Sequence, residues 1–193
     1  MIITRSLRRR SAVFGIALAA LSTMTGTRVH AQASERCDAQ LSESLVDYGR
    51  MTRGQLLERQ PDSARASLGT RRVTLTAVCA ERTAMVLSFQ GATADDTAFR
   101  FAANDRFTLK VLDAQLDGKP VRLAAAQADA TGFAASASLR PGDRMSPVDG
   151  AGLAQGQRLT VQLEIEPFVG AAATRVAAES RWEGAGRFEV LRR

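Results

Sequence analysis

The chain has 193 residues, with 26 basic and 20 acidic side chains, one histidine and two cysteines. Five of the basic residues and none of the acidic ones lie in the first 33 positions, so 21 basic residues stand against 20 acidic ones in the rest. The remaining arginines are interspersed with acids and form no basic patch, so we expect no nucleic-acid partner. About 160 residues suit one domain with a sizeable core.

Residues 1–33 have the pattern of a secretory signal peptide. An uncharged apolar run at residues 12–21 is too short to span a bilayer, which takes about 20 apolar residues. Small residues at Val29-His30-Ala31 or Ala31-Gln32-Ala33 offer a cleavage site. The basic region ahead of the run contains Arg5, Arg8, Arg9 and Arg10. We expect an export signal at residues 1–33 and a mature domain at residues 34–193 that does not insert into the membrane; an uncleaved anchor is the alternative.

Cleavage would also remove His30, the only histidine. A histidine general base, a Ser-His or Cys-His nucleophile pair and a His-ligated zinc or copper site are then excluded. We therefore expect no catalytic residue, no metal and no cofactor in the mature domain.

The first half of the domain is predicted to hold several short strands. Residues 44–49 are expected to form a strand ended by Gly49, and residues 54–70 a loop or a short helix around residues 55–59. Apolar residues alternate along residues 71–80 with Thr74 and Thr76 on the other face; they are Val73, Leu75, Ala77 and Cys79. A separate strand at residues 84–89 is a continuous apolar run, which predicts cover on both faces.

The second half continues the alternation. After a short strand at residues 99–101, the longest one is expected at residues 106–116. Asp117-Gly118 follows it and predicts a two-residue hairpin turn, because a type I′ turn needs positive φ at both central positions. Residues 121–123 would form the returning strand.

The last third is less regular. Residues 124–138 are expected to be a loop or an edge strand, and the glycines and prolines of residues 139–156 indicate a long connection. Residues 158–168 alternate as in a half-buried antiparallel strand. Residues 187–191 end the chain in another strand. Seven or eight short strands with such turns predict an all-β sandwich.

Cys37 and Cys79 are the only cysteines, 42 positions apart. In an exported chain each has only the other as an intramolecular partner, and a disulfide of this span restricts the unfolded chain by about 4 kcal/mol. Two free buried cysteines are the alternative.

These features resemble the subunits of chaperone-usher fimbriae. The resemblance rests on Cys37, the segment Leu45-Val46-Asp47-Tyr48-Gly49, Cys79 at the end of a strand, and a strand at the extreme C-terminus, and it covers the whole mature domain. It implies an immunoglobulin-like β-sandwich that lacks its final strand. A periplasmic pilus chaperone and then, at the outer-membrane usher, the next pilus subunit would fill the groove with a strand.

Carried onto this sequence, the resemblance implies a donor-strand groove lined by Phe188 and Val190 on one side and by Leu45 and Val46 on the other. A sandwich short of one strand exposes unpaired backbone and an apolar cleft, which invites strand addition. We expect a non-enzymatic structural or tip subunit that contributes to cell adhesion, passing through the periplasm to the fimbrium at the cell surface.

Two departures from the family are visible. Filling a groove takes about 10 extended residues, and the predicted cleavage leaves only a few ahead of Cys37, so this subunit would accept a strand without donating one. Cleavage after Ala19 would reverse that inference. The ending Leu191-Arg192-Arg193 lacks the aromatic residue that the family often has next to last.

Two other functions are weighed against this one. The first is a periplasmic immunoglobulin-like binding or accessory module whose C-terminal strand is paired on both edges. The second is a secreted hydrolase that uses the carboxylates of Asp95-Asp96 or Glu164 and Glu166, or a Ser-Lys pair. Asp95-Asp96 are expected in a turn, and Glu164 and Glu166 on the outward face of a strand. Solvated charges belong at such positions, so the hydrolase is the weaker alternative.

Overall fold

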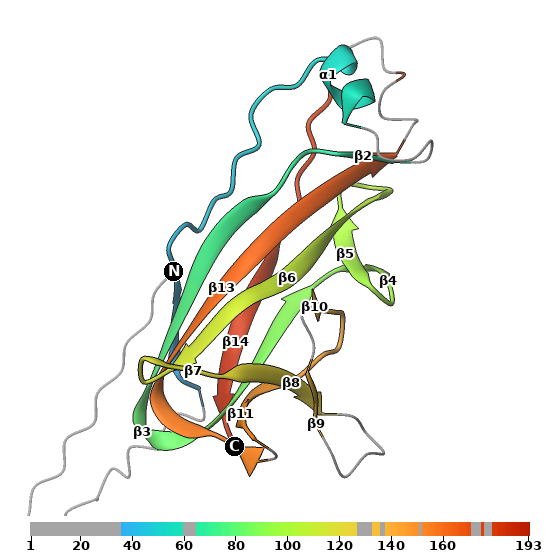
Figure 1. Ribbon diagram of the computed structural model, residues 1–193. Coiled ribbons are helices and arrows are strands. Elements are labelled where there is room, and N and C mark those ends of the chain that lie inside the picture. The colour runs from blue at the N-terminus through green and yellow to red at the C-terminus, as the bar shows by residue number, and fades with distance from the viewer. Residues whose placement is uncertain are drawn as a thin grey trace, which may run out of the picture. The chain divides into compact units, whose positions relative to one another are not determined.

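The computed structural model describes residues 36–59, 65–126, 133–135, 138–150, 152–170, 175 and 179–193. They belong to one compact unit, Ser34–Arg193, built almost wholly of antiparallel strands (Figure 1). The predicted all-β class is therefore confirmed. The export signal predicted at residues 1–33 lies outside the described residues.

The helix and the strands have the following bounds in chain order: β1 (Asp38–Leu41), α1 (Arg53–Glu58), β2 (Arg65–Ser67), β3 (Arg71–Gly91), β4 (Thr93–Asp95), β5 (Ala98–Phe101), β6 (Asp105–Leu116), β7 (Lys119–Pro120), β8 (Arg122–Ala126), β9 (Phe133–Ala135), β10 (Ser138–Leu139), β11 (Met145–Asp149), β12 (Gly152–Leu153), β13 (Gln155–Gly170) and β14 (Gly186–Arg192).

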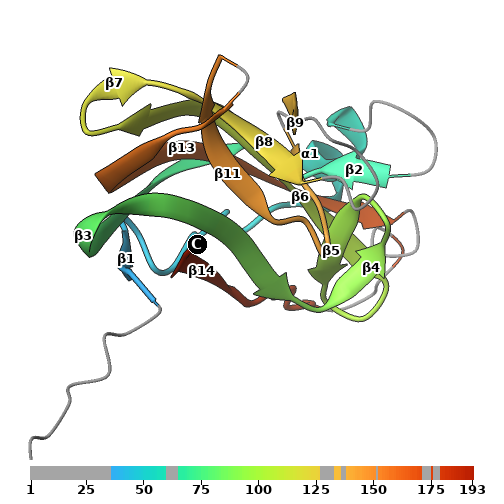
Figure 2. The same cartoon turned by 90° about the horizontal axis from the view of Figure 1, so that it is seen from below.

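Strand β3, 21 residues long, belongs to two sheets. Its first half lies in the larger sheet, between β13 and β1, and β6 and β5 follow on the far side of β13. Its second half lies in the smaller sheet, where it pairs with β14 and, at Leu87, with β11. Figure 2 shows β3 as a long curved ribbon that passes from β1 toward β4, with β14 beside it.

Alternating apolar residues of both sheets form one core. Val73, Leu75 and Ala77 of β3 are buried, as the alternation predicted, and the run from Ala84 to Phe89 is buried on both faces. Aromatic rings join the sheets: the Phe89 ring centroid lies 4.7 Å from that of Phe99. The hydrophobic contacts between the two sheets thus replace the water that each apolar face would otherwise meet.

The predicted hairpin is confirmed. Gln115 pairs with Pro120 and Leu116 with Lys119, and the two residues between have positive φ, 51° at Asp117 and 79° at Gly118. The Asp117 carboxylate accepts hydrogen bonds from the backbone N–H groups of Arg158 (2.8 Å) and Gln157 (3.0 Å). The Arg158 bond is the main reason why the pKa of Asp117 lies below its usual value.

Three predicted boundaries are wrong. Residues 71–91 form one strand instead of two, because residues 80–83 contain no glycine or proline that would end it. The predicted connection at residues 139–156 contains β10, β11 and β12. Residue Pro147 is tolerated in β11 because its carbonyl oxygen accepts a hydrogen bond from Ala154 (2.9 Å), a bond that needs no proline N–H.

The third wrong boundary concerns residues 44–49, which are not a strand. The paired segment comes earlier, at β1, and the last backbone bond of that pairing joins Ser42 N–H to the carbonyl oxygen of Thr74 (2.8 Å). The short helix expected around residues 55–59 is confirmed as α1, which Thr52 caps by accepting from the Gln55 N–H (3.3 Å). The predicted loop or edge strand at residues 124–138 lies partly outside the described residues.

Candidate functional site

The C-terminal strand β14 has a neighbour along one edge only for most of its length. On one side it pairs with β3 from Gly186 to Arg192. On the other side, Arg36 forms a bridge with Leu191, and the Cys37 N–H donates to the carbonyl oxygen of Val190 (2.9 Å). From β1 onward the chain pairs with the other half of β3, and this leaves the start of β14 uncovered.

The backbone groups of β14 that face this open edge follow from strand geometry. The Val190 carbonyl points away from β3, toward Cys37. Because backbone groups alternate with period two along a strand, the N–H and C=O groups of Phe188 and Gly186 point the same way. Within the described ranges no backbone group pairs with them. Two residues of β14 therefore offer hydrogen-bonding groups to a further strand.

A cavity of about 1300 Å³ lies beside this edge; we call it the groove. Its walls are two segments without regular secondary structure: residues 43–51, which follow β1, and residues 179–185, which lead into β14. Its floor consists of apolar side chains from both sheets, α1 and the segment after β2: Leu56, Leu68, Val73, Phe89, Phe101, Phe107, Leu109, Ile165 and Pro167. A volume above the usual range for small-molecule sites, about 300–1,000 Å³, suits an extended peptide.

The wall at residues 43–51 is anchored by a side chain. The Tyr48 hydroxyl donates to the carbonyl oxygen of Ile165 in β13 (2.8 Å). Burial is the main reason why the pKa of Tyr48 is raised to about 12, so the phenol is neutral at physiological pH. Within the same wall, the backbone N–H of Gly49 donates a hydrogen bond to Asp47 Oδ1 (2.8 Å). The wall is thus held in place without a strand beside it.

The four residues predicted to line a donor-strand groove are placed as follows. Leu45, Val46 and Phe188 line the groove. Leu45 is 82% exposed, whereas Val46 and Phe188 pack partly against the core. Val190 does not line the groove: it is 1% exposed, lies opposite Leu87 of β3, and its edge is covered by Cys37. Their donor-strand role stays a prediction.

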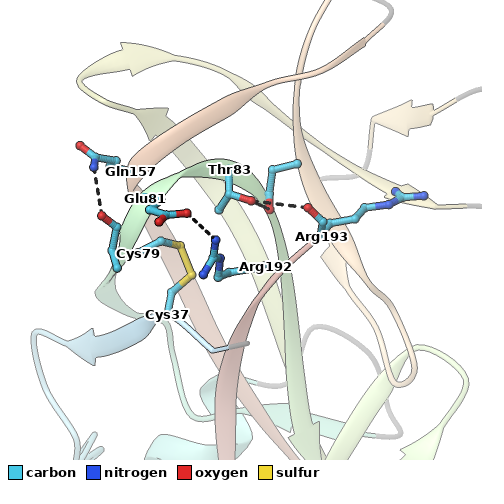
Figure 3. Close-up of polar contacts among 9 residues, drawn as sticks. Cys37, Cys79, Glu81, Thr83, Gln157, Arg192 and Arg193 are labelled. Carbon is cyan, nitrogen blue, oxygen red and sulfur yellow. Dashed lines mark hydrogen bonds and ion pairs between the residues drawn. A yellow bond between two sulfur atoms is a disulfide. The ribbon is translucent and has the colours of Figure 1, made fainter. Parts of the chain in front are cut away.

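The predicted disulfide between Cys37 and Cys79 is confirmed, with 4.4 Å between the two Cα atoms. Figure 3 shows that polar contacts hold the end of β14 beside this disulfide. Arg192 donates to Glu81 (3.0 Å), and the Arg193 N–H donates to the carbonyl oxygen of Ala84 (2.9 Å). The edge of β14 is therefore covered at its C-terminal end and open toward residues 179–185.

At the other end, close to α1, a second cavity of about 500 Å³ adjoins the groove and shares Tyr48, Arg50, Met51 and Leu68 with it. Arg59 and Arg71 also line this second cavity, which we call the arginine cavity. The Arg71 guanidinium lies 5.6 Å from the centroid of the Tyr48 ring, a cation–π contact. The position of the arginine cavity was not predicted, because the six arginines in residues 50–72 show no spacing that identifies which of them converge.

Gly184 and Gly186 are a further feature that the sequence did not reveal. A Cβ atom on Gly184 would lie 2.9 Å from Phe101, and one on Gly186 would lie 2.0 Å from Phe89. These glycines let the backbone of the groove wall pass directly over the aromatic floor. A glycine pair next to a strand was visible, but the aromatic partners come from strands far away in sequence.

In the part of the chain that the structure describes, no three His, Cys, Asp or Glu side chains gather as metal ligands would. The same residues include no helix with the length and apolar character needed to cross a bilayer.

Similarity to known proteins is found among solved structures. No protein-family model matches this sequence, and no curated protein matches it. Among solved structures, the chain is similar to the P pilus rod subunit PapA, with 11% sequence identity and a TM-score of 0.39, over 82% of this chain and 99% of that one. A similarity of this degree assigns neither family nor function.

Proposed function

We propose that this protein receives an extended segment of another polypeptide in the groove and works as an exported subunit of a chaperone-usher fimbria. The observation that carries the proposal is the open edge of β14 at Gly186 and Phe188, which faces an apolar cavity of about 1300 Å³. An incoming strand would pair with this edge through its backbone and place alternate side chains on the floor, as in other cases of β-strand addition.

Leu45 supports an occupant of this kind. A leucine that is 82% exposed at the lip of an apolar cavity has no packing role in the chain alone. Burying a leucine fully contributes about 1.5–3 kcal/mol, so an occupant that covers it gains binding free energy at no cost to the fold. The open apolar floor likewise favours strand addition over a solvated edge.

The partners follow from this mode. A periplasmic pilus chaperone would occupy the groove during export, and at the outer-membrane usher another subunit would replace it, which places the protein at the fimbrium with a role in cell adhesion. The chain would act by binding, without catalysis. The alternative of an accessory module with a complete sandwich needs β14 paired on both edges, and in the described residues Gly186 and Phe188 pair only with β3.

The proposal is tested by peptide binding. Ten-residue peptides that alternate valine with threonine, blocked at both ends, are titrated into the purified protein while the fluorescence of Trp182, the only tryptophan and a groove residue, is followed. We expect saturable binding and a rise in Tm that grows with peptide concentration. A scrambled peptide with its apolar residues grouped at one end is the control.

Two matched variants place the binding in the groove. Leu45→Asp removes the burial free energy of a leucine, about 1.5–3 kcal/mol. Because about 1.4 kcal/mol corresponds to a tenfold change in affinity, peptide binding should weaken at least tenfold. Leu112→Asp changes another exposed leucine, 36% exposed on β6, which does not line the groove, and should leave binding unchanged. A stable protein that binds no peptide, or an equal effect of both variants, would contradict the proposed function.

A further inference from the structure

The arginine cavity carries positive charge that its own surroundings do not neutralise. Arg50 forms an ion pair with Glu179 at 3.6 Å between two well-exposed side chains. Arg59 donates to the carbonyl oxygen of Leu68 (3.0 Å), and Arg71 stacks on Tyr48. Among the described residues, no carboxylate lies within ion-pair distance of Arg59 or Arg71.

Glu166, an acid whose charge acts on Tyr48, is engaged by a hydroxyl group. Glu166 accepts a hydrogen bond from the hydroxyl of Ser67 (2.6 Å), a residue that lines the arginine cavity. Three arginines line the cavity, and none of the described residues that line it is acidic. The cavity therefore favours an anionic group that comes from outside the described chain.

The connection between the two cavities decides where that group comes from. An exposed ion pair contributes about 0–1 kcal/mol, so a small free anion would not be retained at this site. A carboxylate on a strand that already lies in the groove has an effective concentration near millimolar or above, and even a weak pair then adds to affinity. Tyr48, Arg50, Met51 and Leu68 belong to both cavities, so the end of such a strand reaches the arginines.

We propose that the arginine cavity binds the side-chain carboxylate of an Asp or Glu at the end of the incoming strand that lies beside α1. This inference rests on the proposed function and adds a chemical requirement on the partner: apolar residues at alternate positions, with an acid at one end. Arg59 and Arg71 would supply the guanidinium groups, and their pairing with the carboxylate fixes the strand's register along β14.

Three blocked ten-residue peptides with the same alternating core test the inference. They carry Glu at the first position, Glu at the last position, or Gln at both, and are titrated into the purified protein with Trp182 fluorescence as the readout. We expect one of the two Glu peptides to bind about threefold to tenfold more tightly than the Gln peptide at 20 mM salt. The ratio should fall toward one near 500 mM salt, where the Debye length is a few Å.

Variants assign the preference to the cavity. With Arg59→Gln and Arg71→Gln combined, the preference for Glu should disappear while the Gln peptide still binds. Arg122→Gln removes another exposed positive charge, on β8 and outside both cavities, and should leave the preference unchanged. Circular dichroism shows whether the double variant folds, and the salt dependence of the wild-type protein tests the inference without it.

The outcomes separate the two proposals. Equal affinity for all three peptides, a ratio that salt does not change, or a preference that survives in the double variant would overturn the inference while leaving the groove as a binding site. Binding of none of the peptides would refute the proposed function and this inference with it. Competition by 1 mM sodium acetate against the Glu peptide would show a site for free anions instead of one that reads the strand.

Discussion

Removal of the buried disulfide should strongly lower the stability of the domain. We predict that the combined substitution Cys37→Ala and Cys79→Ala lowers the free energy of unfolding by about 4 kcal/mol, because a loop closed over 42 positions restricts the unfolded chain by that amount. Domains have about 5–15 kcal/mol in total, so the variant would keep a marginal fold. Equilibrium unfolding in urea, followed by far-UV circular dichroism, measures the loss.

With an m-value of about 2 kcal/mol per molar urea, the midpoint should fall by about 2 M. Wild-type protein in excess dithiothreitol should shift to the midpoint of the variant, and the reductant should leave the variant itself unchanged. If the midpoint falls by less than about 0.5 M, the loop-entropy reasoning is refuted, since it would then account for no more than a quarter of its expected effect.

Three further predictions use the same urea assay. Val190→Ala removes two methyl groups from a side chain that is 1% exposed and should cost about 2 kcal/mol; a loss below 0.5 kcal/mol would show that the site is not core. In Gly186→Ala the new Cβ would lie 2.0 Å from a phenylalanine ring, so this variant should lose about 1–3 kcal/mol of stability. In the control Gly152→Ala the new Cβ meets nothing within 4 Å, so stability should change by less than about 1 kcal/mol. Equal effects of the two variants would contradict the close approach of the Gly186 backbone to the ring. Hydrogen bonds, chiefly from a threonine hydroxyl, lower the pKa of Asp95 to about 2, and backbone hydrogen bonds lower that of Asp117. A carboxyl with a lowered folded-state pKa stabilises the fold above its unfolded pKa, about 4, and loses that contribution as the pH falls toward 2. The double variant Asp95→Asn, Asp117→Asn should therefore lose less stability than the wild-type protein between pH 5 and pH 2. An identical pH dependence of stability in the two proteins would count against this assignment.

Much of the fold could be predicted because its strands obey local rules. The alternation of Val73, Leu75 and Ala77 in β3, and of Leu159 and Val161 in β13, places apolar side chains on one face without reference to the rest of the chain. Asp117-Gly118 determines its turn through φ alone. Such features need only neighbouring residues, so the sequence reveals them.

The errors arise where a partner distant in sequence decides the outcome. Residues 44–49 have the composition of a strand, yet they form no backbone pairing with another segment of the described chain. The glycines and prolines around β11 predict a connection, although Met145 and Val148, on either side of Pro147, are buried in the core. A local pattern gives the capacity for a strand, but pairing depends on tertiary structure.

The candidate site likewise combines residues that the sequence indicates and residues that it does not. Leu45, Val46 and Phe188 were selected through a family resemblance, and the structure places them around one cavity. The aromatic floor and the arginine cavity were not foreseen, because their members come from strands and loops that meet only in the folded chain. Arg59 and Arg71 in particular look like ordinary surface residues in the sequence.

The covalent link between Cys37 and Cys79 also determines how the domain would carry tension. A pull on residues that precede Cys37 is delivered through the two sulfurs to Cys79, near the middle of β3. There the chain is hydrogen-bonded to β1 and β13, so the load would have to shear this long strand from its neighbours instead of opening a few bonds one at a time. Without the link, the same pull would peel Cys37 away from the edge of β14. The disulfide thus carries a pull from the N-terminal side past Cys37 directly into the longest strand of the domain.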